Sequence, residues 1–503
     1  MPAGRGVGTL AAVLLLAGTL GGGGWWFLSR PLAATFACQP PDATISACGT
    51  STVGCLTAQG LSPGSYEVTV ARAGFTTMTS EVQVRRFSDN QFDFTLEPAP
   101  QRVSVTAKPK GALCRVVRDD NEILSDKDSV EGTVPAGPVT VEVSLAGYNT
   151  ITRDLFLDSA TELSFVLDPE GQLVRTLGTL DCAGAPKAVA IAPDGSQVWT
   201  TILNGPPSIE TFDLATLSKT AEIDLGAYGA VEIAFNQQGT RAYASQMETA
   251  RVFEIDVATH KVLREFDTES AWTKLVLLSP TQKLVFAANW SGDDVSVIDV
   301  AEGRLRRRIP APDTPRGLWA TDDNTLYVAG FGDGDLWRVE TDSGGWKELF
   351  DGNGALRHIV GDNARGKLFI SDMSKDVVLV HDISSGKTTT FVETDEKPNT
   401  IDLSPDGKVL FVSCRGENNP TSYYLPGPEW GTILLFDATD GTPLDAIVGG
   451  NQCTALDVSD DGRLLVFSDF LDDRLRVYEV PTYEELAAGN GGRWKAHFEE
   501  LEK

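Results

Sequence analysis

An acidic residue recurs along most of the chain at nearly constant intervals. It ends one apolar run in each of a series of similar segments, and the series consists of Asp213, Asp256, Asp299, Glu340, Asp382, Asp437 and Glu479. The successive spacings are 43, 43, 41, 42, 55 and 42 residues. A sustained internal period of this length means that one supersecondary unit is copied several times. Each copy then buries its apolar surface against its neighbours.

The segment 272–312 shows what one unit contains. Its four short apolar runs are residues 274–278, 283–288, 295–300 and 304–309. They are rich in β-branched and aromatic residues and are separated by turn formers, which predicts antiparallel strands. Four strands per unit and seven units predict an all-β chain whose main domain, residues 170–480, is a seven-bladed β-propeller.

The last unit lacks a fourth strand, because no such run follows Glu479 directly. A spare run, QLVRTLGTL at 172–180, precedes the first unit and is similar to the fourth strands at 262–266 and 305–309. We expect this run to complete the last blade and close the ring, which leaves few exposed sheet edges.

Two stretches of the repeat resemble a known family. SPDGKVLFVS at 404–413 and VSVIDVAEGRLRRRI at 295–309 resemble the YVTN-type β-propeller repeat, as found in YncE-like proteins. The resemblance covers residues 171–480 and implies the propeller fold. It implies little about function, because propellers of this kind include binding proteins, lactonases and subunits of redox enzymes.

A second, shorter repeat precedes the propeller in residues 32–100 and 101–169. The first copy contains PGSYEVTV at 63–70 and the second PAGPVTVEV at 135–143, a turn followed by alternating residues. This pattern predicts two small β-sandwiches. They resemble PEGA domains, since PKGA at 109–112 matches that family's signature and PPDA at 40–43 matches it more loosely. The resemblance implies exported or surface proteins and supplies no catalytic residues.

The N-terminal segment 1–31 contains an uncharged, mostly apolar stretch, TLAAVLLLAGTLGGGGWWFL at 9–28. Twenty residues of helix span about 30 Å, the thickness of a bilayer's hydrocarbon layer. We therefore expect an N-terminal hydrophobic helix acting as a single-pass membrane anchor in the cell envelope. The domains would lie on the extracytoplasmic side, in the periplasm or at the cell surface. The alternative is a signal peptide cleaved near residues 34–37.

The tail, residues 481–503, is expected to be helical. Thr482 can cap a first turn that carries Glu484 and Glu485 at its positive end.

Charge and cysteine content narrow the function classes. The chain has 42 Lys and Arg against 70 Asp and Glu, a net charge of −28, which argues against a nucleic-acid partner. None of the seven cysteines forms a CxxC pair, so no metal site is expected. Cys48 with Cys55, and Cys182 with Cys453, are candidate disulfides; free buried thiols are the alternative.

Basic residues gather at one level of the predicted ring. When the blades are aligned on the turn that ends the first strand, one position reads Lys187, Val231, Lys274, Arg316, Arg357, Asn399 and Thr454. Four cations around one mouth of the central channel would attract anions. His358 follows Arg357 on its strand. Alternatively, these bases pair with acidic residues of the loops between second and third strands, namely Asp293, Asp294, Asp333, Asp335, Asp376, Asp472 and Asp473.

The long spacing of 55 residues marks an extended loop, residues 415–430. It carries Tyr423, Tyr424 and Trp430, which offer large apolar area with polar tips. By topology this loop lies at the mouth with the basic residues, where it binds a ligand or plugs the channel.

These features predict an exported, membrane-anchored, non-catalytic binding or scaffold protein without a cofactor. Its ligand site would combine the four basic residues with His358, Asn399, Tyr423, Tyr424 and Trp430. The expected partners are an envelope protein or a small anionic ligand, and the membrane through the N-terminal segment. The alternative is a hydrolase of the lactonase kind that uses His358, Arg357 and Arg316.

Overall fold

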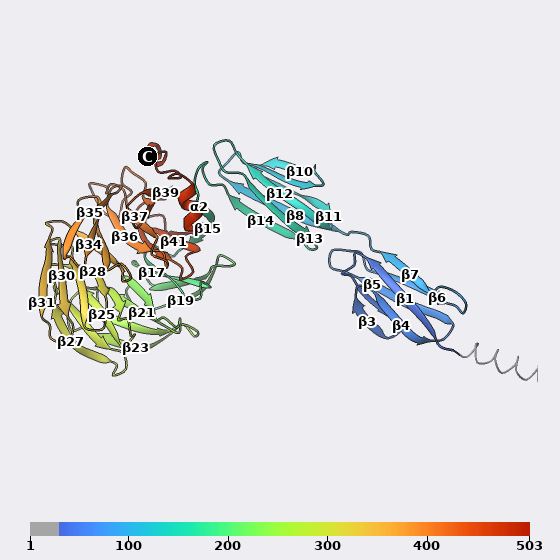
Figure 1. Cartoon of the computed structure of the whole chain (residues 1–503), viewed down its shortest axis with the longest axis horizontal. Coiled ribbons are helices and arrows are strands. Elements are labelled where there is room, and N and C mark those ends of the chain that lie inside the picture. The colour runs from blue at the N-terminus through green and yellow to red at the C-terminus, as the bar shows by residue number, and fades with distance from the viewer. Residues whose placement is uncertain (1–29) are drawn as a thin grey trace, which may run out of the picture. The chain divides into compact units, whose positions relative to one another are not determined.

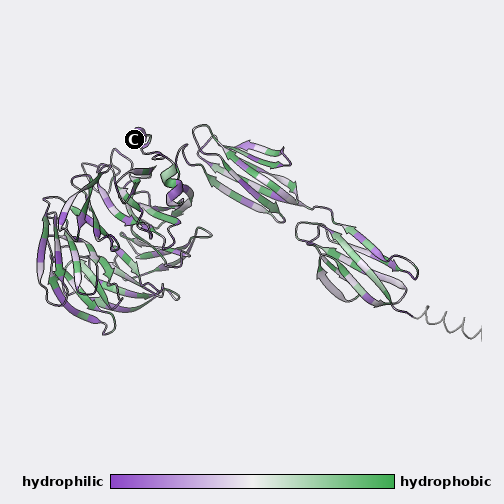
Figure 2. Cartoon of the chain, viewed as in Figure 1, coloured by the Kyte–Doolittle hydropathy of each residue, from purple (hydrophilic) through white to green (hydrophobic). Residues whose placement is uncertain are grey.

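The computed structural model describes residues 30–503 (Figure 1). Within this range the chain forms two compact units, residues 30–145 with 150–165 and residues 146–149 with 166–503. Both are built from β-strands. In the described range the helices are α2 (Tyr483–Ala488) and the 3-10 helix η1 (His497–Glu500). Hydrophobic and hydrophilic residues are interspersed along the strands (Figure 2).

The larger unit consists of four-stranded antiparallel sheets, seven of them within the described residues. The first strands are β16 (Pro186–Ile191), β20 (Glu232–Phe235), β24 (Thr273–Leu278), β28 (Pro315–Ala320), β32 (Leu356–Asp362), β36 (Pro398–Leu403) and β40 (Cys453–Val458). The second strands are β17 (Gln197–Ile202), β21 (Arg241–Gln246), β25 (Leu284–Asn289), β29 (Thr325–Gly330), β33 (Lys367–Asp372), β37 (Val409–Cys414) and β41 (Leu464–Asp469).

The fourth strand is the most exposed strand of each sheet except in the sheet that ends with β39. The third strands are β18 (Ile209–Asp213), β22 (Arg251–Asp256), β26 (Asp294–Asp299), β30 (Asp335–Glu340), β34 (Val377–Asp382), β38 (Thr432–Asp437) and β42 (Arg474–Glu479). The fourth strands are β19 (Ser218–Ile223), β23 (Lys261–Asp267), β27 (Arg304–Pro310), β31 (Trp346–Asp351), β35 (Lys387–Glu393), β39 (Pro443–Val448) and β15 (Arg175–Asp181).

Each first strand contacts the first strand of the next sheet, and β40 contacts β16, so the sheets form a closed ring. Apolar clusters fill the space between successive sheets, including the space between the last sheet and the first. A sheet with two apolar faces needs a neighbour on each side, and the ring supplies one. The arrangement is consistent with a β-propeller.

The recurring acidic residue has a local structural reason. In every sheet it is the last residue of the third strand. Asp213 accepts hydrogen bonds from the backbone N–H and hydroxyl of Thr216, and Asp256 does the same with Thr259. The acid thus caps the turn into the fourth strand. Hydrogen bonds to the charged form also lower the pKa of both carboxyls.

The spare N-terminal run closes the ring, as the sequence predicted. Strand β15 pairs antiparallel with β42, from Arg175 opposite Glu479 to Asp181 opposite Arg474. The strand starts three residues later than expected, at Arg175. Asp445 holds the residues just before it, because its Oδ2 accepts from the N–H groups of Leu173 and Val174.

The smaller unit contains two pairs of sheets. In the first pair a three-stranded sheet has the order β4-β1-β7 and a four-stranded sheet the order β3-β2-β5-β6. In the second pair the orders are β11-β8-β14 and β10-β9-β12-β13. The first set of strands is β1 (Leu32–Gln39), β2 (Thr44–Ala47), β3 (Thr50–Val53), β4 (Leu56–Leu61), β5 (Gly64–Ala71), β6 (Met78–Val84) and β7 (Gln91–Thr95). The second set is β8 (Pro100–Lys108), β9 (Leu113–Arg118), β10 (Asn121–Lys127), β11 (Ser129–Pro135), β12 (Gly137–Ser144), β13 (Ile151–Leu157) and β14 (Thr161–Val166).

The C-terminal tail packs against the ring. Thr482 caps α2 in a capping box with Glu485, in agreement with the prediction. Beyond it, the Trp494 ring packs edge-on against Phe436 at 5.2 Å. His497 is buried, and its Nε2 lies 3.1 Å from Asp395.

The expectation of a single-pass membrane anchor is corrected. None of the helices within residues 30–503 is both long and apolar enough to cross a bilayer, and α2 has only six residues. The stretch 9–28, on which the expectation rested, lies outside the described residues.

Neither candidate disulfide forms, since all seven cysteines are free thiols. Cys48 lies in the turn between β2 and β3, whereas Cys55 follows the other end of β3. Four strand residues cover about 13 Å, and a disulfide needs Cα atoms within about 7 Å. Cys453 is buried with its thiol directed at Asp469, whereas the Cys182 thiol is directed at the carbonyl of Leu180.

Candidate functional site: a charged cavity in the ring

The predicted basic residues share a backbone feature that the sequence did not reveal. Lys187, Lys274, Arg316 and Arg357 each fall where the pairing of the first strand with the second skips one residue. They are therefore the extra residues of β-bulges. A bulge turns one side chain away from the regular alternation of the strand, and bulges are common beside functional sites.

Hydroxyl groups from neighbouring sheets bind the first strands at the level of these basic residues. Ser245 donates to the carbonyl of Lys274 at 2.6 Å, and Ser371 donates to that of Asn399 at 2.7 Å. Each of these serines lies on the second strand of the preceding sheet. The level of the basic ring is thus fixed by contacts between sheets.

The bulges bring the cations together around one carboxylate, Glu232. Arg316 is 2% exposed, and its Nη1 lies 3.5 Å from Glu232 Oε2. Arg357 is 6% exposed and forms no side-chain hydrogen bond or ion pair with another residue of the described chain. The Lys274 ammonium lies 3.4 Å from the centre of the Trp290 ring, a cation–π contact. The charge of Glu232 therefore acts on three of the four basic residues, Arg316, Arg357 and Lys187.

The loop aspartates are not the partners of these cations. Asp293 Oδ1 accepts from the N–H of Thr314, and Asp376 Oδ1 accepts from that of Lys397. In both cases the acceptor lies in one sheet and the donor precedes the first strand of the next. These carboxylates fasten neighbouring sheets together through the backbone.

Burial and mutual repulsion shift the pKa values of the basic groups. Desolvation, followed by the charge of Arg316, lowers the pKa of Lys274 to about 6. Desolvation and Arg357 lower the pKa of Lys187 well below its ordinary value. Desolvation raises the pKa of Glu232, although Arg316 opposes the shift. The cluster thus lacks enough negative charge to stabilise all of its cations.

His358 is a neutral imidazole in this cluster. Desolvation and the charge of Arg357 lower its pKa to about 3. Its Nδ1 lies 3.5 Å from the N–H of Ile401 and accepts from it. The neutral ring therefore carries its proton on Nε2 and cannot accept a further proton there.

The long loop covers the mouth at the basic end. Lys187 Nζ donates to the Tyr423 hydroxyl at 2.7 Å, and the Arg415 guanidinium lies 4.3 Å from the centre of the same ring. Gln452 Nε2 donates to the Tyr423 carbonyl at 2.8 Å. The loop thus holds one aromatic side chain directly against the basic cluster.

The other predicted loop residues lie elsewhere. Tyr424 is 55% exposed and packs edge-on against Tyr423. Trp430 contacts the tail, because its N–H donates to Leu501 and the Lys503 ammonium lies 4.5 Å from its ring centre. Trp430 therefore lies against the tail and is not among the residues that line the cavity described below.

Asn399 remains at the level of the basic ring but is enclosed. It is 1% exposed, and both polar atoms of its side chain lack a hydrogen-bond partner. Sequence reasoning missed four other residues, Glu232, Trp290, Arg415 and Gln452. Glu232 stands one position after Val231 in the aligned ring, so an acid beside an otherwise basic position was the available signal.

A cavity of about 370 Å³ runs through the ring beneath the basic cluster. Lys187, Glu232, Arg357 and His358 line one end of it. At the other end its lining includes the turn residues Gln237 and Asp460, which are exposed. The cavity is therefore covered at the basic end by Tyr423 and communicates with solvent at the opposite end.

The opposite end is acidic. Asp402 and Asp457 line the cavity on neighbouring first strands, together with Asp460. Asp402 Oδ2 accepts from the N–H of Val458 at 3.0 Å, and Asp457 Oδ2 accepts from that of Ile191 at 2.6 Å. Burial raises the pKa of both carboxyls, and Asp402 raises that of Asp457 further.

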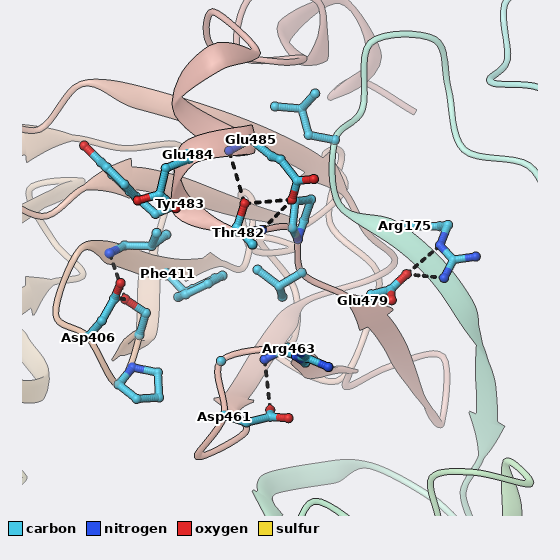
Figure 3. A pocket seen from close by; sticks show the side chains of 17 residues that line it. Arg175, Asp406, Phe411, Asp461, Arg463, Glu479, Thr482, Tyr483, Glu484 and Glu485 are labelled. Carbon is cyan, nitrogen blue, oxygen red and sulfur yellow. Dashed lines mark hydrogen bonds and ion pairs between the residues drawn. The ribbon is translucent and has the colours of Figure 1, made fainter.

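A larger hollow of about 860 Å³ lies beside α2 (Figure 3). Several of its charged side chains are bound to one another or to neighbouring backbone and hydroxyl groups. Arg175 pairs with Glu479, Glu485 bonds with Thr482, and Asp461 accepts from the N–H of Arg463. None of the predicted site residues lines this hollow.

Comparison with known proteins gives relatives but no matching family model. Antigen Lp49 of Leptospira interrogans is 33% identical over 357 residues, which covers 68% of this chain and 77% of the relative. The uncharacterized protein YncE of Salmonella typhimurium is 21% identical over 182 residues, which is 35% of this chain and 51% of YncE. THO complex subunit 6 of Drosophila melanogaster is 25% identical over 166 residues, 30% of this chain and 47% of that protein. From the extent and identity of the first match, the chain belongs to the family of Antigen Lp49.

Proposed function

We propose that the protein is a non-catalytic binding protein whose ring cavity receives the anionic group of a small ligand. The observation that carries the proposal is Arg357. Burial lowers the pKa of its guanidinium, but an arginine keeps its proton in proteins. The group lines the cavity and forms no hydrogen bond or ion pair within the described chain, and the charge of Glu232 acts on it only at longer range. A buried charge without a partner is unfavourable, and an anion in the cavity would remove that cost.

The proposal includes a finer description of the fold. The sheets of the larger unit are the blades of a seven-bladed YVTN-type propeller, and the two sheet pairs of the smaller unit are PEGA-like domains. The ring contacts and the YncE similarity support the first assignment. The repeated order of the sheets supports the second.

A binding role is favoured over hydrolysis by the state of His358. A general base needs a free nitrogen lone pair within reach of a substrate. In His358, Nδ1 accepts a backbone hydrogen bond and Nε2 carries the proton. Tyr423, held by Lys187, also covers the cavity at this end.

The test is calorimetric titration of the full chain with acetate, succinate and inorganic phosphate. We expect at least one of these anions to bind. Its affinity should be higher at a pH near the pKa of Lys274 than at a pH about two units above that pKa. Protonated Lys274 adds a positive charge, so its pKa of about 6 sets this direction.

Variants assign the site. Arg357→Met should weaken anion binding about 10–100-fold, the range for a hydrogen bond to a charged group. Arg306→Met is the matched control, because this side chain is half-exposed on an outer strand and pairs with Asp342. Equal affinity in both variants, or no binding of any of the three anions, would overturn the proposal.

We further propose that the protein is exported to a place that antibodies reach, with support from the name of its relative, an antigen. Protease treatment of intact cells should then degrade it and spare a cytosolic marker. Full protection until lysis would contradict export.

A further inference from the structure

The cavity has ends of opposite charge. Lys187 and Arg357 line the end beneath Tyr423, whereas Asp402 and Asp457 line the open end. A simple anion must pass the carboxyls to reach the arginine, and they repel it to the extent that they are ionised. A ligand with a positive group at its trailing end would be attracted at both ends. This inference rests on the proposed function and names the ligand class of the same site.

The separation of the two charged levels can be obtained from the strands. Asp402 follows Asn399 by three residues on β36, and Asp457 follows Thr454 by three on β40. Asn399 and Thr454 belong to the basic level. Three strand residues advance about 10 Å. This is a spacing of backbone levels, and a flexible five-carbon ω-amino acid can adapt its length to it while keeping a hydrogen bond at each end.

Asp402 and Asp457 also hold neighbouring sheets together, but this role does not use all of their hydrogen-bond acceptor positions. Each carboxylate uses Oδ2 for a backbone N–H of the next sheet. Asp402 Oδ1 also accepts from the N–H of Leu403, and the two carboxyls share a side-chain hydrogen bond. Two carboxylates offer about eight acceptor positions, and Oδ1 of Asp457 accepts from no backbone N–H in the described chain, so acceptor positions remain. Two close carboxyls tend to retain one proton between them, and an ammonium group can take the place of that proton.

We propose that the cavity binds a small zwitterion whose carboxylate meets Arg357 and whose ammonium group meets Asp402 and Asp457. The 370 Å³ volume admits a molecule of this size. The unpartnered guanidinium fixes the orientation, because it is the better partner for a planar carboxylate. The ammonium end then lies toward the open mouth.

The probe is ω-aminopentanoate, titrated into the full chain by calorimetry. Its matched controls are pentanoate, which lacks the amine, and pentylamine, which lacks the carboxylate. We expect ω-aminopentanoate to bind about tenfold or more tightly than any control, as one additional charge-assisted contact predicts.

Two variants locate the ends. Asp457→Asn should reduce the affinity for ω-aminopentanoate to that for pentanoate and leave pentanoate binding unchanged. Arg357→Met should weaken both. Circular dichroism and melting curves check that each variant folds. The comparison of ligands is made on the unaltered chain, so it does not depend on the folding of any variant.

The outcomes separate the two proposals. If pentanoate binds as tightly as ω-aminopentanoate, the anion site stands and the zwitterion proposal is overturned. If neither compound nor any simple anion binds, both proposals fail. Pentylamine binding alone would overturn both, since it would place a cation site where an anion site is proposed.

Discussion

The closing strand β15 should be an integral part of the ring, and two leucines on it provide the test. Leu180 is 2% exposed and lies in the cluster that joins the last sheet to the first, with Val198 and Leu475. Leu177, on the same strand, is 37% exposed. The substitutions Leu180→Ala and Leu177→Ala remove the same atoms from the same strand. Any difference in unfolding free energy between the two variants therefore reports the burial of Leu180 where β15 closes the ring.

The expected magnitudes follow from these exposures. Truncating a fully buried leucine costs about 2–5 kcal/mol, because transfer free energy is lost and a cavity remains. The same change at a site as exposed as Leu177 should cost about 1 kcal/mol or less. Since domains are stabilised by about 5–15 kcal/mol, Leu180→Ala should remove a large part of the stability of this unit.

Urea unfolding followed by tryptophan fluorescence measures the difference in the full chain. Eight of the ten tryptophans lie in the larger unit, and the other two, Trp25 and Trp26, lie outside the described residues, so the signal reports mainly the ring. We expect the unfolding free energy of Leu180→Ala to fall at least about 2 kcal/mol below that of Leu177→Ala. If the two variants agree within about 0.5 kcal/mol, β15 is not part of the cooperative ring.

Three further outcomes are expected. Asp445→Asn should destabilise the larger unit by about 1–3 kcal/mol in urea unfolding, because a buried backbone donor loses its carboxylate acceptor. The exposed control Asp440→Asn should cost under about 1 kcal/mol, and equal losses in the two variants would contradict this expectation. Lys274→Met tests how the stability of the ring depends on pH. The pKa of Lys274 is about 6 in the folded chain and 10.5 ordinarily, so between these pH values the unfolded chain binds more protons than the folded chain. The stability of the unaltered chain should therefore rise with pH over this range. Melting curves should show that rise to be smaller in Lys274→Met, and an identical rise would refute the shift. Exposed Cys55 should react with a thiol reagent in the native state and buried Cys453 only on unfolding, and native labelling of Cys453 would contradict its burial.

Local sequence determined the strands, the period and the ring closure. The acid at the end of each third strand is a local signal, because its hydrogen bonds reach only the following turn, as Asp213 does with Thr216. The spare run before the first sheet could be assigned by elimination, since the last sheet lacked a fourth strand. The level of the four basic residues also followed from alignment of equivalent turns.

Tertiary structure decided the chemistry of the cavity. The contact of Lys187 with Tyr423 joins residues 236 positions apart, and the path of the loop depends on contacts that no local pattern encodes. The contact of Trp430 with the tail is another such case, because the tail returns from the end of the chain. Glu232 and the pair Asp402 and Asp457 act through side chains from different sheets, so their proximity exists only once the ring closes. Periodicity fixes which residues form strands, whereas charge complementarity depends on which strands face one another across the ring.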